Sequence, residues 1–141
     1  MNKNGFTLIE LLAVIAIIAL ISLVAIPNIV GLSTNVRKDQ MLDDAKKLIS
    51  NAKYLVNKSY DIRTNPPKTF TFDELNANGD IKNDPDGGNY DTTRSKVTYS
   101  VQNNIAKYCV ILIGSKRSIK TSSNGCVYED SLYSRSNVID N

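Results

Sequence analysis

The sequence predicts an α+β fold in which one long N-terminal helix, over about residues 6–60, packs against an antiparallel sheet of three or four strands. Three observations support this prediction. Residues 11–26 carry no charge and form a rod that is apolar on all sides. Residues 41–56 place apolar side chains at the spacing of an amphipathic helix. Residues 97–128 alternate strand-like stretches with turns.

The apolar rod is long enough to cross a membrane. Only Ser22 is polar within residues 11–26, and most residues from there to Leu32 are apolar. A bilayer core of about 30 Å needs about 20 helical residues, so we expect residues 6–32 to form a transmembrane half of the helix. Glu10 is the exception, because a carboxylate at mid-bilayer costs about 2.5 to 3.5 kcal/mol. It therefore needs a partner.

Three simpler explanations of the rod fit less well. A secretory signal peptide has two small residues before its cut, and here Leu23 stands two residues before Ala25. A plain single-pass anchor gives no reason for Gly5 or Glu10. A buried core helix needs more surrounding protein than 141 residues supply.

The start of the chain resembles the class III leader and N-terminal helix of type IV prepilins and the related pseudopilins. The resemblance rests on the apolar rod, on Pro27 and on the run Gly5, Phe6, Thr7, Leu8, Ile9, Glu10. It implies that residues 1–5 are a leader, that cleavage follows Gly5, that Phe6 is N-methylated, and that Glu10 is the fifth mature residue. It also implies assembly roles for Glu10, Thr7 and Pro27. Residues 33–141 would then form an extracytoplasmic head, a pilin roll.

The chemistry of these residues agrees with the resemblance. Cleavage creates an α-amino group on Phe6, with a pKa of about 7.7 to 8.0, on the helical face of Glu10. A buried acid and a buried amine neutralise each other, which removes two desolvation penalties. The resemblance implies that the amine belongs to a neighbouring subunit. Gly5 lacks a Cβ, so a protease can approach the bond closely, and Lys3 fits a cytoplasmic start.

The composition argues against several functions. The chain has 17 basic and 14 acidic residues and no His, so it lacks an imidazole base and a His metal site. Residues 33–60 hold six bases and three acids, whereas residues 61–141 hold ten of each. Residues 61–141 therefore have no electrostatic footprint for general nucleic-acid binding, and Lys116, Arg117 and Lys120 form only a weak basic cluster. No catalytic triad or phosphate loop occurs, and we expect no enzyme.

The second half of the helix carries the apolar stripe of residues 41–56. We expect the stripe to face the protein's own sheet and not a coiled-coil partner, because it lasts barely two heptads. Pro27 removes a backbone donor, so it should bend or locally open the helix. Paired prolines mark a break over residues 61–68.

Short motifs divide the first part of the head. Thr71 and Glu74 have the spacing of a capping box that begins a short helix, and Gly79 can close it. The run NDPDGGN at residues 83–89 has the composition of a turn. Asp84, Pro85, Gly87 and Tyr90 also resemble the calcium loop of some pseudopilins, with Asp84, Asp86 and Asp91 as candidate ligands. We favour a solvated turn and no cofactor, because the acids lack EF-hand spacing.

The strands fill the second part of the head. We expect them at residues 97–101, 106–113, 118–121 and 126–128. Asn103 and Asn104 form a turn, and residues 106–113 are apolar on both faces and so form the central strand. No regular structure is expected in the polar tail, residues 129–141.

Cys109 and Cys126 are the two cysteines of the chain. In an exported head they could form a disulfide worth about 3 kcal/mol in the chain-entropy model. We favour the disulfide because both lie in strand-like segments of one small domain; the alternative is two free buried thiols. Neither is expected to be catalytic, because no His is present to activate a thiol.

A rod that is soluble in lipid when alone and self-complementary when stacked is typical of a filament subunit. The expected function is a type IV pilin for adhesion, surface motility or aggregation, first held as a single-pass membrane precursor and then displayed at the cell surface. A pseudopilin of a competence or secretion filament is the alternative, and a lone exported binding domain is the third. The expected partners are copies of itself, other pilins, a prepilin peptidase/methyltransferase, an assembly platform with its ATPases, and the membrane, but no specific nucleic acid.

Overall fold

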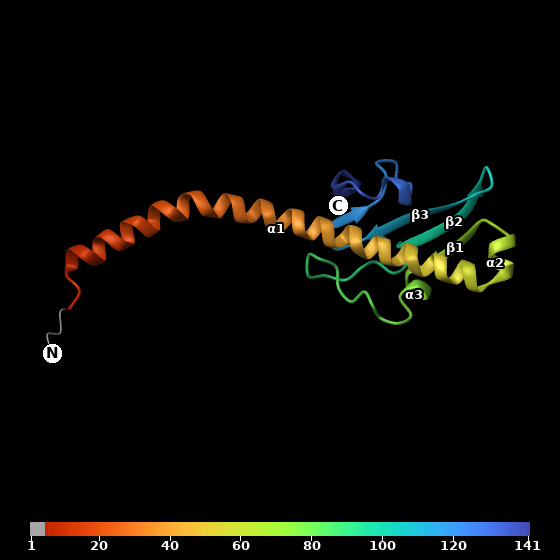
Figure 1. Cartoon of the computed structure of the whole chain (residues 1–141), viewed down its shortest axis with the longest axis horizontal. Helices are drawn as coiled ribbons and strands as arrows, with labels where there is room; N and C mark the ends of the chain where they lie inside the picture. The colour runs from red at the N-terminus through yellow and green to blue at the C-terminus, as the bar shows by residue number, and fades with distance from the viewer. Residues whose placement is uncertain (1–4) are drawn as a thin grey trace. The chain divides into compact units, whose positions relative to one another are not determined.

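The computed structural model describes residues 5–141, and at residues 23–30 it describes only the backbone. The chain divides into two compact units, Met1–Val36 and Arg37–Asn141. One helix, α1 (Leu8–Lys58), contributes residues to both units and is the long helix that the sequence predicts (Figure 1).

In the second unit, α1 buries its predicted apolar stripe against the sheet. The buried stripe residues are Met41, Leu42, Ala45, Leu48, Ile49, Ala52 and Val56. They belong to one hydrophobic core together with Val97, Val110 and Leu112 of the sheet. Figure 1 shows the strands lying along this half of the helix. The stripe is therefore covered by the chain's own sheet, as predicted, and is not an open coiled-coil seam.

The sheet is antiparallel throughout and has six strands in the order β1-β2-β3-β4-β6, with β5 paired to β3. β3 is the central strand, as predicted. The strands are β1 (Lys68–Thr71), β2 (Lys96–Gln102), β3 (Ile105–Ile113), β4 (Arg117–Ile119), β5 (Val127–Tyr128) and β6 (Val138–Asp140). The short helices are α2 (Tyr60–Thr64), α3 (Phe72–Leu75) and the 3-10 turns η1 (Glu129–Ser131) and η2 (Arg135–Asn137).

Local side-chain chemistry explains several of these boundaries. The predicted capping box begins α3: Glu74 N–H donates to Thr71 Oγ1 at 3.3 Å, and Thr71 N–H donates to the Glu74 carboxylate at 2.8 Å. Asn103 and Asn104 have φ angles of 51° and 62°, as a tight hairpin turn between β2 and β3 requires.

Three expectations about the head were wrong. The sheet has six strands and not three or four, because β1 and β6 extend its two edges. β1 buries only Phe70, which is too weak a pattern to identify a strand from sequence. The tail, expected to lack regular structure, forms η1, η2 and β6. The break expected at residues 61–68 is shorter, because α2 continues to Thr64 with Ser59 as its N-cap.

Two expectations about the first half of α1 stay predictions. Within the residues that the structure describes, no helix is long and apolar enough to cross a membrane, so the span expected at residues 6–32 is not confirmed. The bend expected at Pro27 falls in residues 23–30, whose side chains lie outside the description.

Candidate assembly segment

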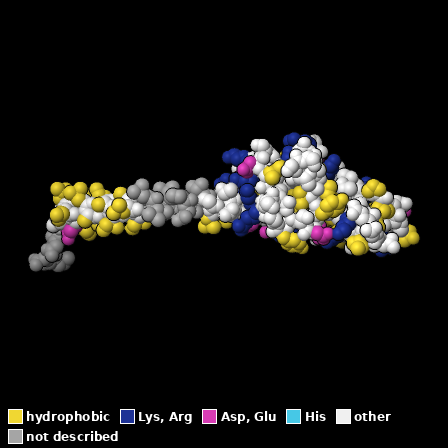
Figure 2. All heavy atoms as spheres, turned by 90° about the horizontal axis from the view of Figure 1, so that it is seen from above, with side chains coloured by type: hydrophobic (Ala, Val, Ile, Leu, Met, Phe, Trp, Pro, Cys, Tyr) yellow, Lys and Arg dark blue, Asp and Glu magenta, His cyan; other side chains and the backbone are white. Residues whose placement is uncertain are grey.

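The first turns of α1 present apolar side chains on every side of the helix. The exposed large apolar residues of these turns, together with Phe6 just before the helix, are Phe6, Leu8, Ile9, Leu11, Leu12, Val14, Ile15, Ile17, Ile18, Leu20 and Ile21. Figure 2 shows apolar side chains covering this end of the helix. Phe6, the expected first residue of the mature chain, is 84% exposed. An apolar surface of this extent is typical of a contact with lipid or with other protein chains.

Glu10 is held at the start of α1 by Thr7. The backbone N–H and the hydroxyl of Thr7 both donate to Glu10 Oε2, each at 2.9 Å. Glu10 N–H lies 3.4 Å from Thr7 Oγ1, which completes a two-way cap of the helix N-terminus. Oε1 of Glu10 makes no hydrogen bond to any residue that the structure describes. The cap therefore orients the carboxylate and leaves one of its oxygens open.

The Thr7 cap was missed by sequence reasoning although its signal is present. Thr7 and Glu10 have the same Thr-x-x-Glu spacing that correctly identified the cap of α3. The apolar run that follows Glu10 is typical of a membrane span, and this stronger pattern masks the capping signal. Gly5 precedes the cap, and a Cβ added to it would meet no atom within 4 Å. The folded chain thus does not itself require glycine at this position.

Residues 1–26 match a family model described as the prokaryotic N-terminal methylation motif. The chain carries an N-terminal methylation motif. The match confirms the N-terminal methylation motif, which is the part of the chain that resembles a class III leader. No curated protein and no solved structure matches the chain. The matched residues end within α1, so the match does not include the head.

In the head, Asp84 anchors the loop that the sequence predicts as a turn. Its Oδ1 accepts from Asp86 N–H at 2.8 Å and from Gly88 N–H at 3.1 Å, while Oδ2 accepts from Ser115 N–H at 2.5 Å. Burial disfavours the charge, but the hydrogen bonds from Ser115, Gly88 and Asp86 outweigh it and lower the pKa of Asp84. The carboxylate therefore joins this loop to the turn between β3 and β4.

The other candidate calcium ligands have their own cationic partners. Asp86 pairs with Arg37 at 3.3 Å and with Arg117. Asp91 accepts from the Thr93 hydroxyl and from Arg94 Nε, each at 2.6 Å, and these bonds lower its pKa. Across the described parts of the chain, no three acidic or cysteine side chains gather as a metal site would require. The acids act as loop anchors here.

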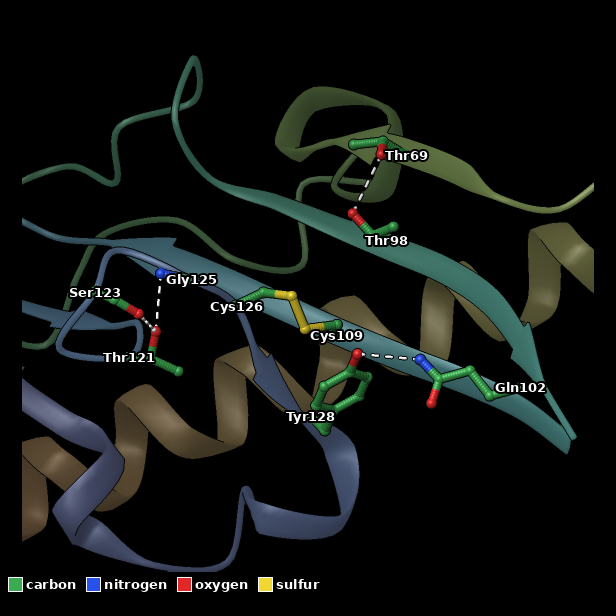
Figure 3. The surroundings of a disulfide bond; sticks show 9 residues. All are labelled: Thr69, Thr98, Gln102, Cys109, Thr121, Ser123, Gly125, Cys126 and Tyr128. Carbon is green, nitrogen blue, oxygen red and sulfur yellow. Dashed lines mark hydrogen bonds between the residues drawn. A yellow bond between two sulfur atoms is a disulfide. The ribbon is translucent and has the colours of Figure 1, made fainter.

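Long-range contacts hold the C-terminal segment against the rest of the head. Arg135 donates to both carboxylate oxygens of Asp39, each at 2.6 Å, and lowers the pKa of that carboxyl. Cys109 of β3 and Cys126 form a disulfide, with their Cα atoms 5.4 Å apart (Figure 3). The sequence leaves open whether these cysteines form a disulfide or remain free thiols, and the structure has the disulfide.

Proposed function

We propose that the chain is the structural subunit of a type IV pilus, which assembles through its N-terminal helix after cleavage between Gly5 and Phe6. The observation that carries this proposal is the methylation motif at the N-terminus of an apolar, exposed helix. A subunit role, and not catalysis, is the function that such a motif favours. The mature chain would be anchored in the membrane before assembly and displayed at the cell surface afterwards.

The Thr7 cap gives a mechanism for pairing between subunits. Because Thr7 occupies Glu10 Oε2, Oε1 can accept the methylated amine of Phe6 from a neighbouring subunit while the cap stays intact. The carboxylate is already oriented, so little side-chain entropy is lost when the amine arrives. Burial of this pair among apolar helices strengthens the attraction between the two charges, because no water is present to solvate either charge separately.

The head supports the same proposal through its covalent and ionic ties. The disulfide and the Arg135–Asp39 pair hold the C-terminal segment in place, which suits a domain exposed outside the cell. The proposed surface roles are adhesion, motility or aggregation, carried out with an assembly platform and its ATPases.

Filaments sheared from cells that express the chain provide the test. Electron micrographs should show long surface filaments, and intact-mass measurement should give a subunit that starts at a methylated Phe6. A mass that retains residues 1–5 would contradict the processing step. Correct processing with no filaments beyond the envelope would favour a pseudopilin over a pilus subunit.

A further inference from the structure

The sheet of the head carries a groove on the face turned away from α1. Val110 and Leu112 of β3 enter the core with α1, so strand alternation places Ile111 and Ile113 on the opposite face. Two hollows of about 370 and 560 Å³ lie there and share Arg94, Ile113 and Lys120 in their lining. Volumes in this range are typical of sites that bind small molecules.

Two lysines flank the floor of the groove in one row across the sheet. Lys96 of β2 is paired with Ile111 of β3, and Leu112 is paired with Ile119 of β4. Lys120 follows Ile119 and so comes beside Ile111. Lys96, Ile111 and Lys120 all line the smaller hollow. Residues directly opposite on neighbouring strands have Cβ atoms about 5 Å apart, so the two lysine Cβ atoms stand about 10 Å apart.

These two lysines differ from the four lysines of the head that form ion pairs. Lys46, Lys47, Lys53 and Lys107 each pair with a carboxylate at 2.5 to 3.2 Å. Lys96 and Lys120 form no ion pair with any residue in the described part of the chain. Arg94 adds a third cation to the lining, and its partner Asp91, at 2.6 Å, is the one acidic side chain among the residues that line the two hollows. The groove therefore keeps positive charge available for an anion.

The remaining lining residues indicate which anion fits. Asn89 and Asn124 offer amides, Thr93 and Ser115 offer hydroxyls, and no residue lining either hollow is aromatic. Proteins that bind single-stranded nucleic acid combine basic grooves with aromatic side chains on which the bases stack. A groove with cations, amides, hydroxyls and an aliphatic floor instead matches a ligand that carries carboxylates and many hydroxyl groups.

The disulfide fixes one wall of this groove in advance. Asn124 sits in a tight turn in which Thr121 N–H donates to Gly125 O and Gly125 N–H donates to Thr121 Oγ1, each at 2.8 Å. The next residue, Cys126, is joined to Cys109 of β3, which holds the turn onto the sheet (Figure 3). A prearranged wall lowers the entropy cost of binding.

We propose that this groove binds an acidic oligosaccharide, with Lys96 and Lys120 pairing with its carboxylates and Asn124 and Thr93 binding its hydroxyls. The proposal concerns the head alone and does not depend on filament assembly. It goes beyond the sequence-based expectation of near-neutral charge over residues 61–141, because the cations are gathered by the sheet register and not by the order of the chain.

Calorimetric titration of the full chain in detergent micelles tests the proposal. The probe is an oligogalacturonate, compared with a neutral oligogalactan of the same length and with oligothymidylate. The acidic saccharide should bind, and the neutral one should bind at least about tenfold more weakly. Each charge-assisted hydrogen bond that the neutral saccharide lacks should lower the affinity by a factor of about ten. Lys96→Gln and Lys120→Gln should each weaken binding about tenfold.

A matched variant separates a built site from general attraction between charges. Lys82→Gln removes the same charge from an exposed lysine that lines neither hollow, so it should leave the affinity unchanged. The proposal fails if Lys82→Gln weakens binding as much as Lys96→Gln, or if the oligogalacturonate does not bind. It also fails if oligothymidylate binds as tightly through the same lysines. Equal melting temperatures of the variants would show that loss of binding is not loss of folding.

Discussion

The Tyr90 hydroxyl donates a hydrogen bond of 2.9 Å to Asp44, a buried carboxylate on α1. The other oxygen of Asp44 accepts from Lys47 at 3.1 Å. Burial, and then the charge of Asp44, raise the pKa of Tyr90. This bond joins the helix to the loop before β2, so it couples two elements that are far apart in the sequence.

Tyr90→Phe should lower the free energy of unfolding of the head by about 1 to 3 kcal/mol, because it leaves a buried carboxylate with one fewer donor. The measurement is denaturant unfolding of the full chain in micelles, with Tyr133→Phe as the control because Tyr133 is 77% exposed. Since the folded-state pKa of Tyr90 is raised, its contribution is complete below about pH 10 and declines above it. Equal stability of the two variants would contradict this role.

The ionised carboxylate of Asp84 should make the head less stable at acidic pH than at neutral pH. Its folded-state pKa is lowered, so its contribution is complete above the unfolded value of about 3.9 and is lost as the pH falls through the folded value. Asp84→Asn should weaken the head at pH 7 and flatten the loss of stability below about pH 4. The melting temperature measured against pH checks this. A variant curve parallel to that of the wild type at all pH values would rule out Asp84 as the titrating group.

Glu10→Gln should permit membrane insertion and cleavage but prevent or sharply reduce filament formation. Insertion becomes easier without a charge, whereas each added subunit would bury a Phe6 amine without its partner. Filament yield and the membrane fraction of processed subunit are the measurements. In cells that express both forms, free entry of Glu10→Gln subunits in proportion to their expression would refute the pairing.

Thr7→Val should reduce filament yield less than Glu10→Gln does, because it removes the hydroxyl donor but keeps the Thr7 N–H bond to Oε2. Thr7→Ser keeps both donors and is the matched control. Filament mass per cell, normalised to processed subunit, compares the three variants. If Thr7→Val equals Thr7→Ser, the hydroxyl does not orient the carboxylate.

Gly5→Val should accumulate the uncut precursor. The space around Gly5 is open, so a larger side chain does not disturb the folded chain, and any effect reports on approach of the protease. Gly31→Val is the control, since a Cβ there also meets no atom within 4 Å. Immunoblots that separate precursor from mature subunit give the answer, and normal processing of Gly5→Val would overturn the close-approach argument.

The sequence alone determined the features that depend on neighbours along the chain. The methylation motif, the cap at Thr71 and Glu74, the turn at Asn103 and Asn104, and the stripe of residues 41–56 are all of this kind. Each is set by spacing within one or two helical turns or within one hairpin, so the residues themselves carry the signal. The Thr7 cap belongs to the same class and could have been predicted.

Only the tertiary structure decided which distant residues meet. β1 and β6 are short and weakly apolar, and they become strands because β2 and β4 offer them unpaired edges. Arg135 reaches Asp39, and Arg37 and Arg117 reach Asp86, only after the chain has closed on itself. Lys96 and Lys120 flank one groove because of strand register, which depends on the packing of whole elements and leaves no short-range pattern in the sequence.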